Sequence, residues 1–193
     1  IRADTIQDLS GNNIINENGN TITIGASGDT TNIVGTLQNN GSAVGGSNTP
    51  SFEATRSSDQ TLSSSTYAKV QYNTETFDTA GAYDNSTNYR FTIPSGQAGK
   101  YYIYASATIS SNAQTDFNFG NIVIYKNGSE YRNLITDHRA NPVFRPYVAV
   151  QGIMDLAVSD YIEIYARVNT GSATPKIQGT NANYFGAYKL IGA

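Results

Sequence analysis

The sequence predicts an all-β protein whose larger part is an antiparallel sandwich of two sheets. Three observations support this. Of 193 residues, 18 are Gly and 14 are Tyr, while only 14% are charged, a mixture that favours strands and turns over helices. No stretch repeats apolar residues at the three- and four-residue spacing of a long helix. Finally, about ten short alternating segments separated by turn residues follow one another after residue 50, which is typical of a sandwich.

The segment Gly99–Ser110 shows the clearest alternation and is expected to be the central strand. Aromatic and β-branched residues with period two indicate a strand that has one buried face. The predicted buried face consists of Tyr101, Ile103, Ala105, Ala107 and Ile109, and the opposite face of Tyr102, Tyr104, Ser106, Thr108 and Ser110. A strand of this length is expected inside a sheet, with neighbours on both sides.

Residues 1–49 contain no aromatic residue and differ from the rest of the chain. Short strands are expected at Ile1–Ile6, Ile14–Ile15, Thr21–Ile24 and Asn32–Leu37, and Gly19–Ile24 repeats weakly nine residues later, at Gly28–Ile33. Each strand offers one or two apolar side chains, too few for a core of its own. The segment therefore packs against copies of itself or another protein, or it stays a disordered tail.

We therefore predict three parts: an attachment and trimerisation segment at residues 1–40, a Gly/Ser-rich linker at residues 41–50, and a domain at residues 51–193. The attachment residues are predicted to be the isoleucines of the first part. They are Ile1, Ile6, Ile14, Ile15, Ile22, Ile24 and Ile33.

Ten strands are expected in residues 51–193. Asn127-Gly128 predicts the clearest hairpin, because both residues tolerate positive φ. In Tyr161–Val168 the even-numbered residues are expected to face inward and Tyr161, Glu163, Tyr165 and Arg167 outward. The strands are Phe52–Arg56, Tyr67–Tyr72, Glu75–Asp78, Tyr89–Ile93, Gly99–Ser110, Asn121–Lys126, Tyr131–Thr136, Tyr147–Asp155, Tyr161–Val168 and Tyr184–Ile191.

Composition argues against several classes of function. A net charge of −3 gives no electrostatic footprint for nucleic acid. The sequence contains no run of 18 apolar residues, so no membrane span is predicted. Arg2, Asp4 and Asp8 interrupt any apolar region of the kind found in signal peptides. Without cysteine there are no disulfides, thiolate catalysts or Cys-based metal sites, so oligomerisation is the expected source of robustness.

The residues that could perform chemistry are few. His138 is the sole histidine and lies in a polar stretch, so a solvated loop residue is favoured over a catalytic one. Carboxylates that could pair for glycoside hydrolysis are present, but nothing in the sequence pairs them. Ca²⁺ could be held by loop oxygens, although turn formation is the better interpretation of these residues. They are Asp59, Asp78, Asp84, Asp116 and Asn118.

Tyrosines are the decisive side chains, because strands that carry tyrosine on both faces must meet something besides one core. Tyrosine suits a subunit interface, where it buries area and keeps a polar group, and it also suits stacking on sugars. We favour the interface, and predict that it includes Tyr102, Tyr104, Tyr161, Tyr165 and Tyr188.

A series of motifs in residues 51–193 resembles the globular head domain of complement one-q. The series begins with Phe52-x-Ala54 and Phe77-Asp78 and ends with Phe185–Leu190; between them lie Tyr83-Asp84, Tyr89–Pro94, Gly99–Ile103, Val123–Gly128 and Leu156–Ile162. At Ser159-Asp160 the family more often has Gly-Asp. The resemblance implies the ten-strand jelly roll shared with the tumour-necrosis-factor family, assembled as a homotrimer.

The N-terminal segment is similar to virion structural proteins of tailed phages, especially marine ones. The similarity lies in Asp4–Asp8 followed by Gly11-Asn12, and in the repeat that starts at Gly19. It implies a virion component that contacts capsid or tail proteins: a capsid decoration protein, a head fibre, or a tail-fibre tip that binds a host-surface glycan. The alternatives are a secreted module that binds carbohydrate or a cell surface and, less favoured, a glycan hydrolase; no cofactor is expected.

Overall fold

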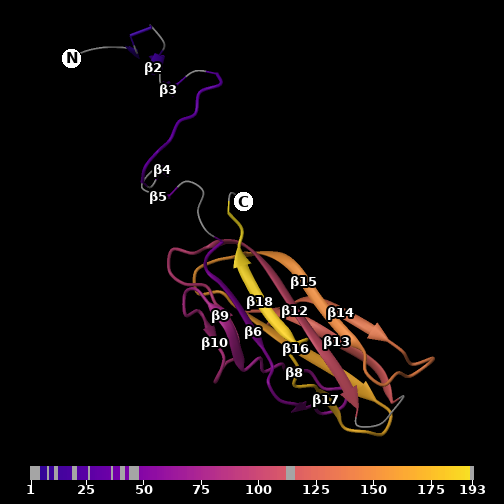
Figure 1. Ribbon diagram of the computed structural model, residues 1–193. Coiled ribbons are helices and arrows are strands. Elements are labelled where there is room, and N and C mark those ends of the chain that lie inside the picture. The colour runs from indigo at the N-terminus through magenta and orange to yellow at the C-terminus, as the bar shows by residue number, and fades with distance from the viewer. Residues whose placement is uncertain are drawn as a thin grey trace. The chain divides into compact units, whose positions relative to one another are not determined.

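The computed structural model describes residues 5–7, 9–10, 13–18, 21–25, 27–35, 37–39, 42–43, 48–111 and 116–191. The chain divides into two compact units, Ile1–Gly46 and Ser47–Ala193. Every regular element in the described residues is a strand (Figure 1), as the sequence predicts. These residues contain no helix long and apolar enough to cross a membrane.

The first unit contains a small antiparallel sheet in the order β1 (Thr5–Gln7), β2 (Asn13–Asn18) and β3 (Thr21–Ile24). A two-residue hairpin follows, formed by β4 (Gln38–Asn39) and β5 (Ser42–Ala43). The prediction of a strand over residues 32–37 is wrong, because the described residues of this range form no strand and pair with none. The hairpin instead extends into the range predicted as linker.

The second unit consists of two antiparallel sheets, which we call the first and second sheet. The first has the order β7 (Gln60–Thr61), β17 (Pro175–Ile177), β12 (Gly99–Ser111), β18 (Tyr184–Lys189), β6 (Ser51–Thr55) and β9 (Thr74–Asp78), with β15 (Tyr147–Leu156) also on β12. The second has the order β10 (Tyr83–Asp84), β11 (Arg90–Thr92), β16 (Tyr161–Thr170), β13 (Phe117–Lys126) and β14 (Ser129–Asp137), with β8 (Ala68–Lys69) on β16.

β12 is the central strand of the first sheet, as predicted. β15 pairs with it from Gly99 to Thr108 on one side, and β18 and β17 pair with it in turn on the other. All five residues of its predicted inner face are buried. Ser106 and Ser110 of the opposite face are also buried; the Ser106 hydroxyl donates to the carbonyl of Ala182, 2.7 Å away.

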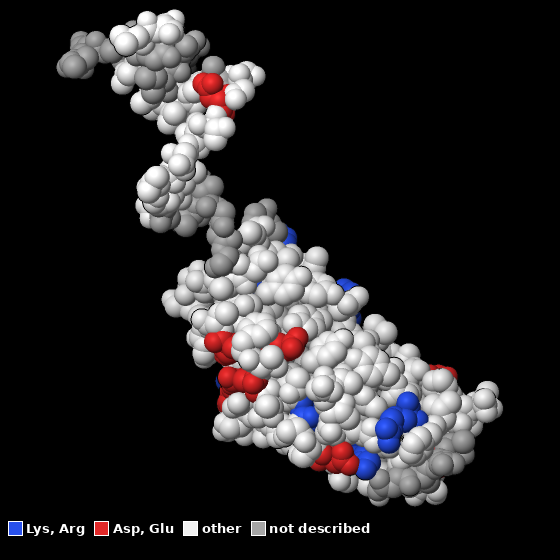
Figure 2. Space-filling view, in the orientation of Figure 1, with Lys and Arg blue, Asp and Glu red and all other residues white. Residues whose placement is uncertain are grey.

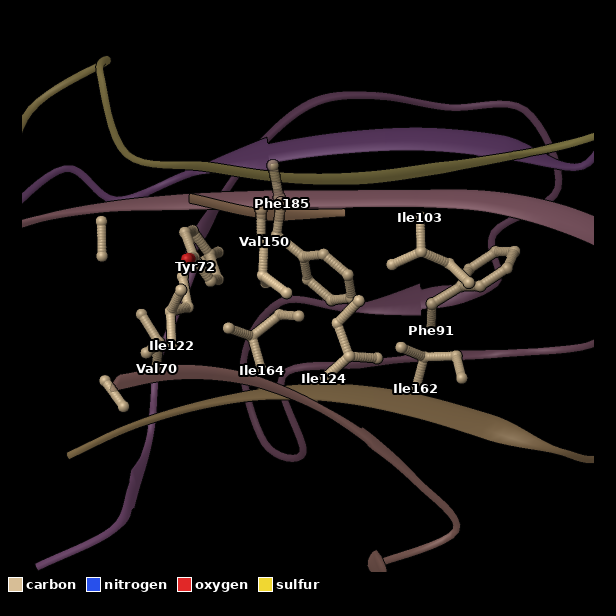
Figure 3. Close-up of a cluster of buried hydrophobic side chains, with 14 of the residues drawn as sticks. Val70, Tyr72, Phe91, Ile103, Ile122, Ile124, Val150, Ile162, Ile164 and Phe185 are labelled. Atoms are coloured by element: carbon tan, nitrogen blue, oxygen red, sulfur yellow. The ribbon is translucent and has the colours of Figure 1, made fainter. Parts of the chain in front are cut away.

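The core lies between the two sheets. Figure 3 shows Phe185 and Ile103 of the first sheet pointing toward Ile122, Ile124 and Ile164 of the second. Phe52 stacks on Tyr83 and on Phe91, with ring centroids 4.5 and 4.7 Å apart. Two buried phenols are satisfied by backbone carbonyls, since Tyr83 donates to the carbonyl of Tyr72 and Tyr72 donates to that of Ser106.

Turn chemistry joins the strands where the sequence predicts it. Asn127 and Gly128 have φ of 51° and 77° and close the β13–β14 hairpin. The alternation of β16 holds for its apolar residues, but Glu163, which we predicted to face outward, is only 5% exposed. An ion pair of 2.5 Å with Lys69 explains this burial, because β8 lies directly beside β16. That pairing cannot be seen in the local sequence.

Candidate interaction surfaces

The outer side of the first sheet carries a group of half-buried and exposed tyrosines that we call the tyrosine face. It consists of Tyr102, Tyr104, Tyr147, Tyr184 and Tyr188. Strand register gathers them: Tyr102 lies opposite Tyr188 of β18, and Tyr104 lies one pleat further along β12. Residues far apart in the sequence thus form one continuous surface.

The rings of the tyrosine face contact one another. The Tyr102 ring centroid is 5.9 Å from that of Tyr104 and 5.5 Å from that of Tyr188, and Tyr104 lies 5.8 Å from Tyr184. Such offset and tilted contacts are the favoured arrangement of aromatic pairs. The rings form a preassembled surface.

Polar contacts fix these rings in place. The Tyr102 hydroxyl donates to Oε1 of Gln151 at 2.7 Å, and the Tyr104 hydroxyl donates to Oε2 of Glu53 at 3.0 Å. Burial, together with this bond to Glu53, raises the pKa of Tyr104 well above its ordinary value. The phenol therefore stays neutral and remains a donor across the physiological pH range.

Exposed apolar side chains border the tyrosine face, whose own Tyr147 is 50% exposed. Ile153 is 54% and Phe77 45% exposed; Ile153 is the register partner of Tyr102. Figure 2 shows a broad uncharged surface over β12 and β18, with acidic side chains gathered beside it over β6 and β9. A continuous apolar surface of this kind is typical of an interaction site.

A second apolar surface lies at the open edge of the sandwich, on β14. Eight of its nine residues are exposed, including Tyr131, Leu134 and Ile135. Leu134 pairs with the buried Ile122 and therefore faces the interior, yet it is 46% exposed. The sandwich is incompletely covered along this strand.

The structure does not bring all five predicted interface tyrosines together. Tyr102, Tyr104 and Tyr188 lie on the tyrosine face, whereas Tyr161 and Tyr165 lie on β16 and point outward from the second sheet. The two groups are on opposite sides of the sandwich, so one contiguous patch cannot contain them all. Tyr147 and Tyr184 belong to the tyrosine face but were absent from the predicted set; their alternation with buried Val148 and Phe185 was the available signal.

The N-terminal sheet has an isoleucine face, formed by Ile6, Ile15, Ile22 and Ile24. Ile6 pairs with Ile15 and Ile15 with Ile24, so three isoleucines form a row across the sheet. Ile6, Ile22 and Ile24 are 52%, 67% and 54% exposed. Of the other predicted attachment residues, Ile33 is exposed in an irregular segment, while Ile1 and the side chain of Ile14 lie outside what the structure describes.

The loop acids that were considered for Ca²⁺ have other partners. Asp84 accepts hydrogen bonds from the backbone of residues 86–88, and Asp116 from the backbone of Ser172 and Ala173. Asp59 pairs with Lys176. Among the described residues no three His, Cys, Asp or Glu side chains gather into a metal-binding group.

His138 lies beside Phe117, and its Nε2 is 3.2 Å from Oγ1 of Thr136. Both contacts are with side chains of the same end of the second sheet.

Comparison with known proteins identifies the architecture. No protein-family model matches the sequence, and no curated protein matches it. Solved structures do match: murine APRIL at pH 5.0 is 11% identical, with a TM-score of 0.53 over 72% of this chain and 98% of that one. Eiger TNF from S. frugiperda is 9% identical, with a TM-score of 0.55 over 74% of this chain and 93% of that one. The globular domain of zebrafish complement 1qA is 12% identical, with a TM-score of 0.53 over 74% of this chain and 98% of that one.

The second unit is therefore a jelly roll of the type found in these proteins. The predicted resemblance of residues 51–193 is confirmed as a likeness of fold. The similarity of the N-terminal segment to virion proteins has no counterpart in these comparisons and stays a prediction.

Proposed function

We propose that this chain is a non-enzymatic structural protein that assembles as a homotrimer through its jelly-roll domain. The observation that carries the proposal is the tyrosine face, whose rings are already packed against one another while the neighbouring Ile153 and Phe77 remain exposed. Tyrosine-rich surfaces with a desolvated centre are favoured at protein interfaces.

Threefold symmetry needs two different surfaces, because each subunit of a closed ring contacts its neighbours through unlike patches. The tyrosine face supplies one patch. The edge of β14, with Tyr131 and Leu134, supplies an apolar patch of different shape. Packing the edge of one subunit on the tyrosine face of the next would cover both.

We further propose that the N-terminal segment attaches the trimer to a larger assembly, and that this assembly is a virion. Support comes from the isoleucine face, since a three-stranded sheet without a partner cannot bury it, and from the resemblance in sequence to virion proteins. The face would pack against sister chains or a capsid or tail protein.

Light scattering of residues 47–193 tests the assembly. These residues form a compact unit with its own core, so we expect them to fold and to give three times the monomer mass at micromolar concentration. A monomer mass would refute assembly through the jelly roll.

Deleting residues 1–40 tests the attachment. The truncated chain should remain trimeric and should fail to bind the virion, whereas the full chain should be present in purified particles. If the truncated chain binds the virion as completely as the full chain, attachment lies in the jelly roll and not in residues 1–40. Absence of the full chain from purified particles would refute the virion role.

A further inference from the structure

The outer side of the second sheet carries a separate aromatic cluster around Val123. Ile122 and Ile124 on either side of it fill the core, so alternation directs Val123 outward, where it is nevertheless fully buried. Tyr67 precedes β8, beside β16, and its hydroxyl lies 3.3 Å from Nδ2 of Asn133 on β14. The Tyr67 side chain therefore reaches from the β8 side of β16 toward β14, across the outer side of the sheet that carries Val123.

Two further tyrosines, Tyr125 and Tyr165, complete the aromatic cluster, which we call the platform. The Tyr125 and Tyr165 rings lie 4.3 Å apart at 33° to one another, the shortest ring contact in the described residues. Both are half-buried, and no hydrogen bond in the described part of the chain involves either hydroxyl. The platform presents ring surface together with free polar atoms.

Hydrogen-bonding side chains frame the platform on its β14 side. Asn121 donates to Oδ1 of Asn133, and Asn133 contacts Oε1 of Glu130 at 3.3 Å. Asn121 is only 6% exposed, and its buried Oδ1 has no hydrogen-bond partner in the described residues. Such an orphaned acceptor is unusual in a folded protein.

Charged groups frame the other side. Lys69 is held by its ion pair with Glu163 and also donates to the carbonyl of Asn88. Arg167 lies 5.7 Å from the Tyr67 ring and 5.3 Å from the Phe119 ring, and no carboxylate of the described residues pairs with it. The donors and acceptors are fixed in position around the half-buried rings.

We propose that the platform is a carbohydrate-binding site. The apolar C–H face of a sugar ring stacks on an aromatic ring, and its hydroxyls need nearby donors and acceptors with restricted geometry. Tyr125 and Tyr165 supply the stacking surface, while Glu130, Asn133 and Lys69 supply the polar contacts. The interleaving of each ring with amide and charged groups favours a sugar over a protein partner, for which a larger apolar centre is expected.

The platform is centred on a different sheet from the tyrosine face, although it borders the β14 edge that the proposed trimer uses. The platform lies on the second sheet and the tyrosine face on the first, with the core between them. Packing on the tyrosine face would leave Tyr125 and Tyr165 uncovered, and the β14 edge would have to pack through Tyr131 and Leu134 without covering Glu130 and Asn133.

An oligosaccharide array probed with the full chain tests the proposal. The array should include neutral hexose and N-acetylhexosamine oligomers and acidic oligomers with uronic or sialic acids. Any oligosaccharide bound there is then titrated in solution by calorimetry, so that multivalency does not affect the measured affinity. We expect Tyr125→Ala and Tyr165→Ala each to weaken binding by about tenfold or more through loss of stacking.

Two controls make the test specific. Tyr125→Phe keeps the ring and should bind within about threefold of the wild-type chain, since stacking is retained; Phe144→Ala removes an exposed aromatic ring elsewhere and should have no effect. Absence of binding across the array would overturn the proposal. So would affinity that survives both alanine variants in the folded chain, or binding to a glycoprotein that persists after its glycans are removed, which would indicate a protein partner.

Discussion

The phenol of Tyr104 lies over Gly186, its register partner in β18, and reaches across it to Glu53 on β6. A Cβ at Gly186 would collide with the ring and would also approach the carbonyl of Phe52 to 2.9 Å. The glycine thus permits the ring to lie across the strand, which is how tyrosines from two strands form one surface.

Gly186→Val should therefore displace Tyr104 and destabilise the second unit by about 1–3 kcal/mol, the usual cost of overpacking. Denaturant unfolding measures the loss. Gly152→Ala is the matched control, because its new Cβ meets only the flexible side chain of Arg132. Equal effects of the two substitutions would contradict the role assigned to Gly186.

Tyr102→Asp should abolish the trimer, since it places a charge without a partner in the proposed interface at a cost of about 2–5 kcal/mol. Sedimentation or light scattering should show monomers. Tyr165→Asp is the control: it lies on the opposite sheet and should leave the trimer intact. A trimer that dissociates with Tyr165→Asp but persists with Tyr102→Asp would move the interface to the second sheet.

Ser159→Gly should stabilise the fold by about 0.5–1 kcal/mol. Ser159 has φ of 69° in the turn between β15 and β16. This conformation costs a residue with a side chain roughly 1–2 kcal/mol relative to glycine. Glycine loses more conformational entropy on folding, which offsets part of that gain. Thermal unfolding checks the sign. Ser95→Gly lies in a turn where the serine lacks positive φ and should not stabilise the fold. An equal gain in stability from Ser95→Gly would show that positive φ is not the cause of the effect at Ser159.

Asp160 should contribute stability that disappears in acid. Its pKa is lowered to about 2, first by Lys126 and then by Asn127 and the backbone N–H of Ala157. Because the folded pKa lies below the ordinary value of 3.8, the contribution is complete above about pH 4 and is lost as the pH falls toward 2.

Asp160→Asn should consequently lower stability at pH 7 by about 1–2 kcal/mol and flatten the pH dependence between 4 and 2. Denaturant unfolding across that range measures both effects. Glu75→Gln, an exposed strand residue, serves as control. A variant that keeps the full acid slope would show that other carboxylates cause it.

Ile22→Asp combined with Ile24→Asp should release the N-terminal sheet from its partner. In the wild-type assembly the amides of β3 should exchange slowly with solvent, and in the variant they should exchange almost freely. Thr21→Asp with Thr23→Asp alters the same strand at positions that alternate with the isoleucines. Rapid exchange already in the wild-type assembly would contradict attachment through the isoleucine face.

The sequence predicts the faces of individual strands well, because alternation is a local property. The apolar buried residues of β12 and β16 were identified, whereas the buried Ser106, Ser110 and Glu163 were not, and Asn127-Gly128 located its hairpin. Ser159 illustrates a finer signal: the residue that departs from the complement family's usual glycine is one that adopts positive φ.

What alternation cannot predict is which sheet a strand joins. Tyr104 and Tyr165 look alike in sequence, each outward-facing on a regular strand, yet they lie on opposite sides of the sandwich. Two-residue strands such as β7 carry no periodicity and were missed. The platform depends on Tyr67 reaching across two strands to Asn133, a contact between residues 66 positions apart.

The core between the two sheets has a consequence for how this protein can change over generations. Packed sheets lie about 10 Å apart, and substitutions at that separation generally have additive effects. Mutations that alter the outward surface of β13 and β16 therefore need not disturb the surface of β12 and β18. Substitutions on one outer surface could thus change what binds there without altering the surface on the other side.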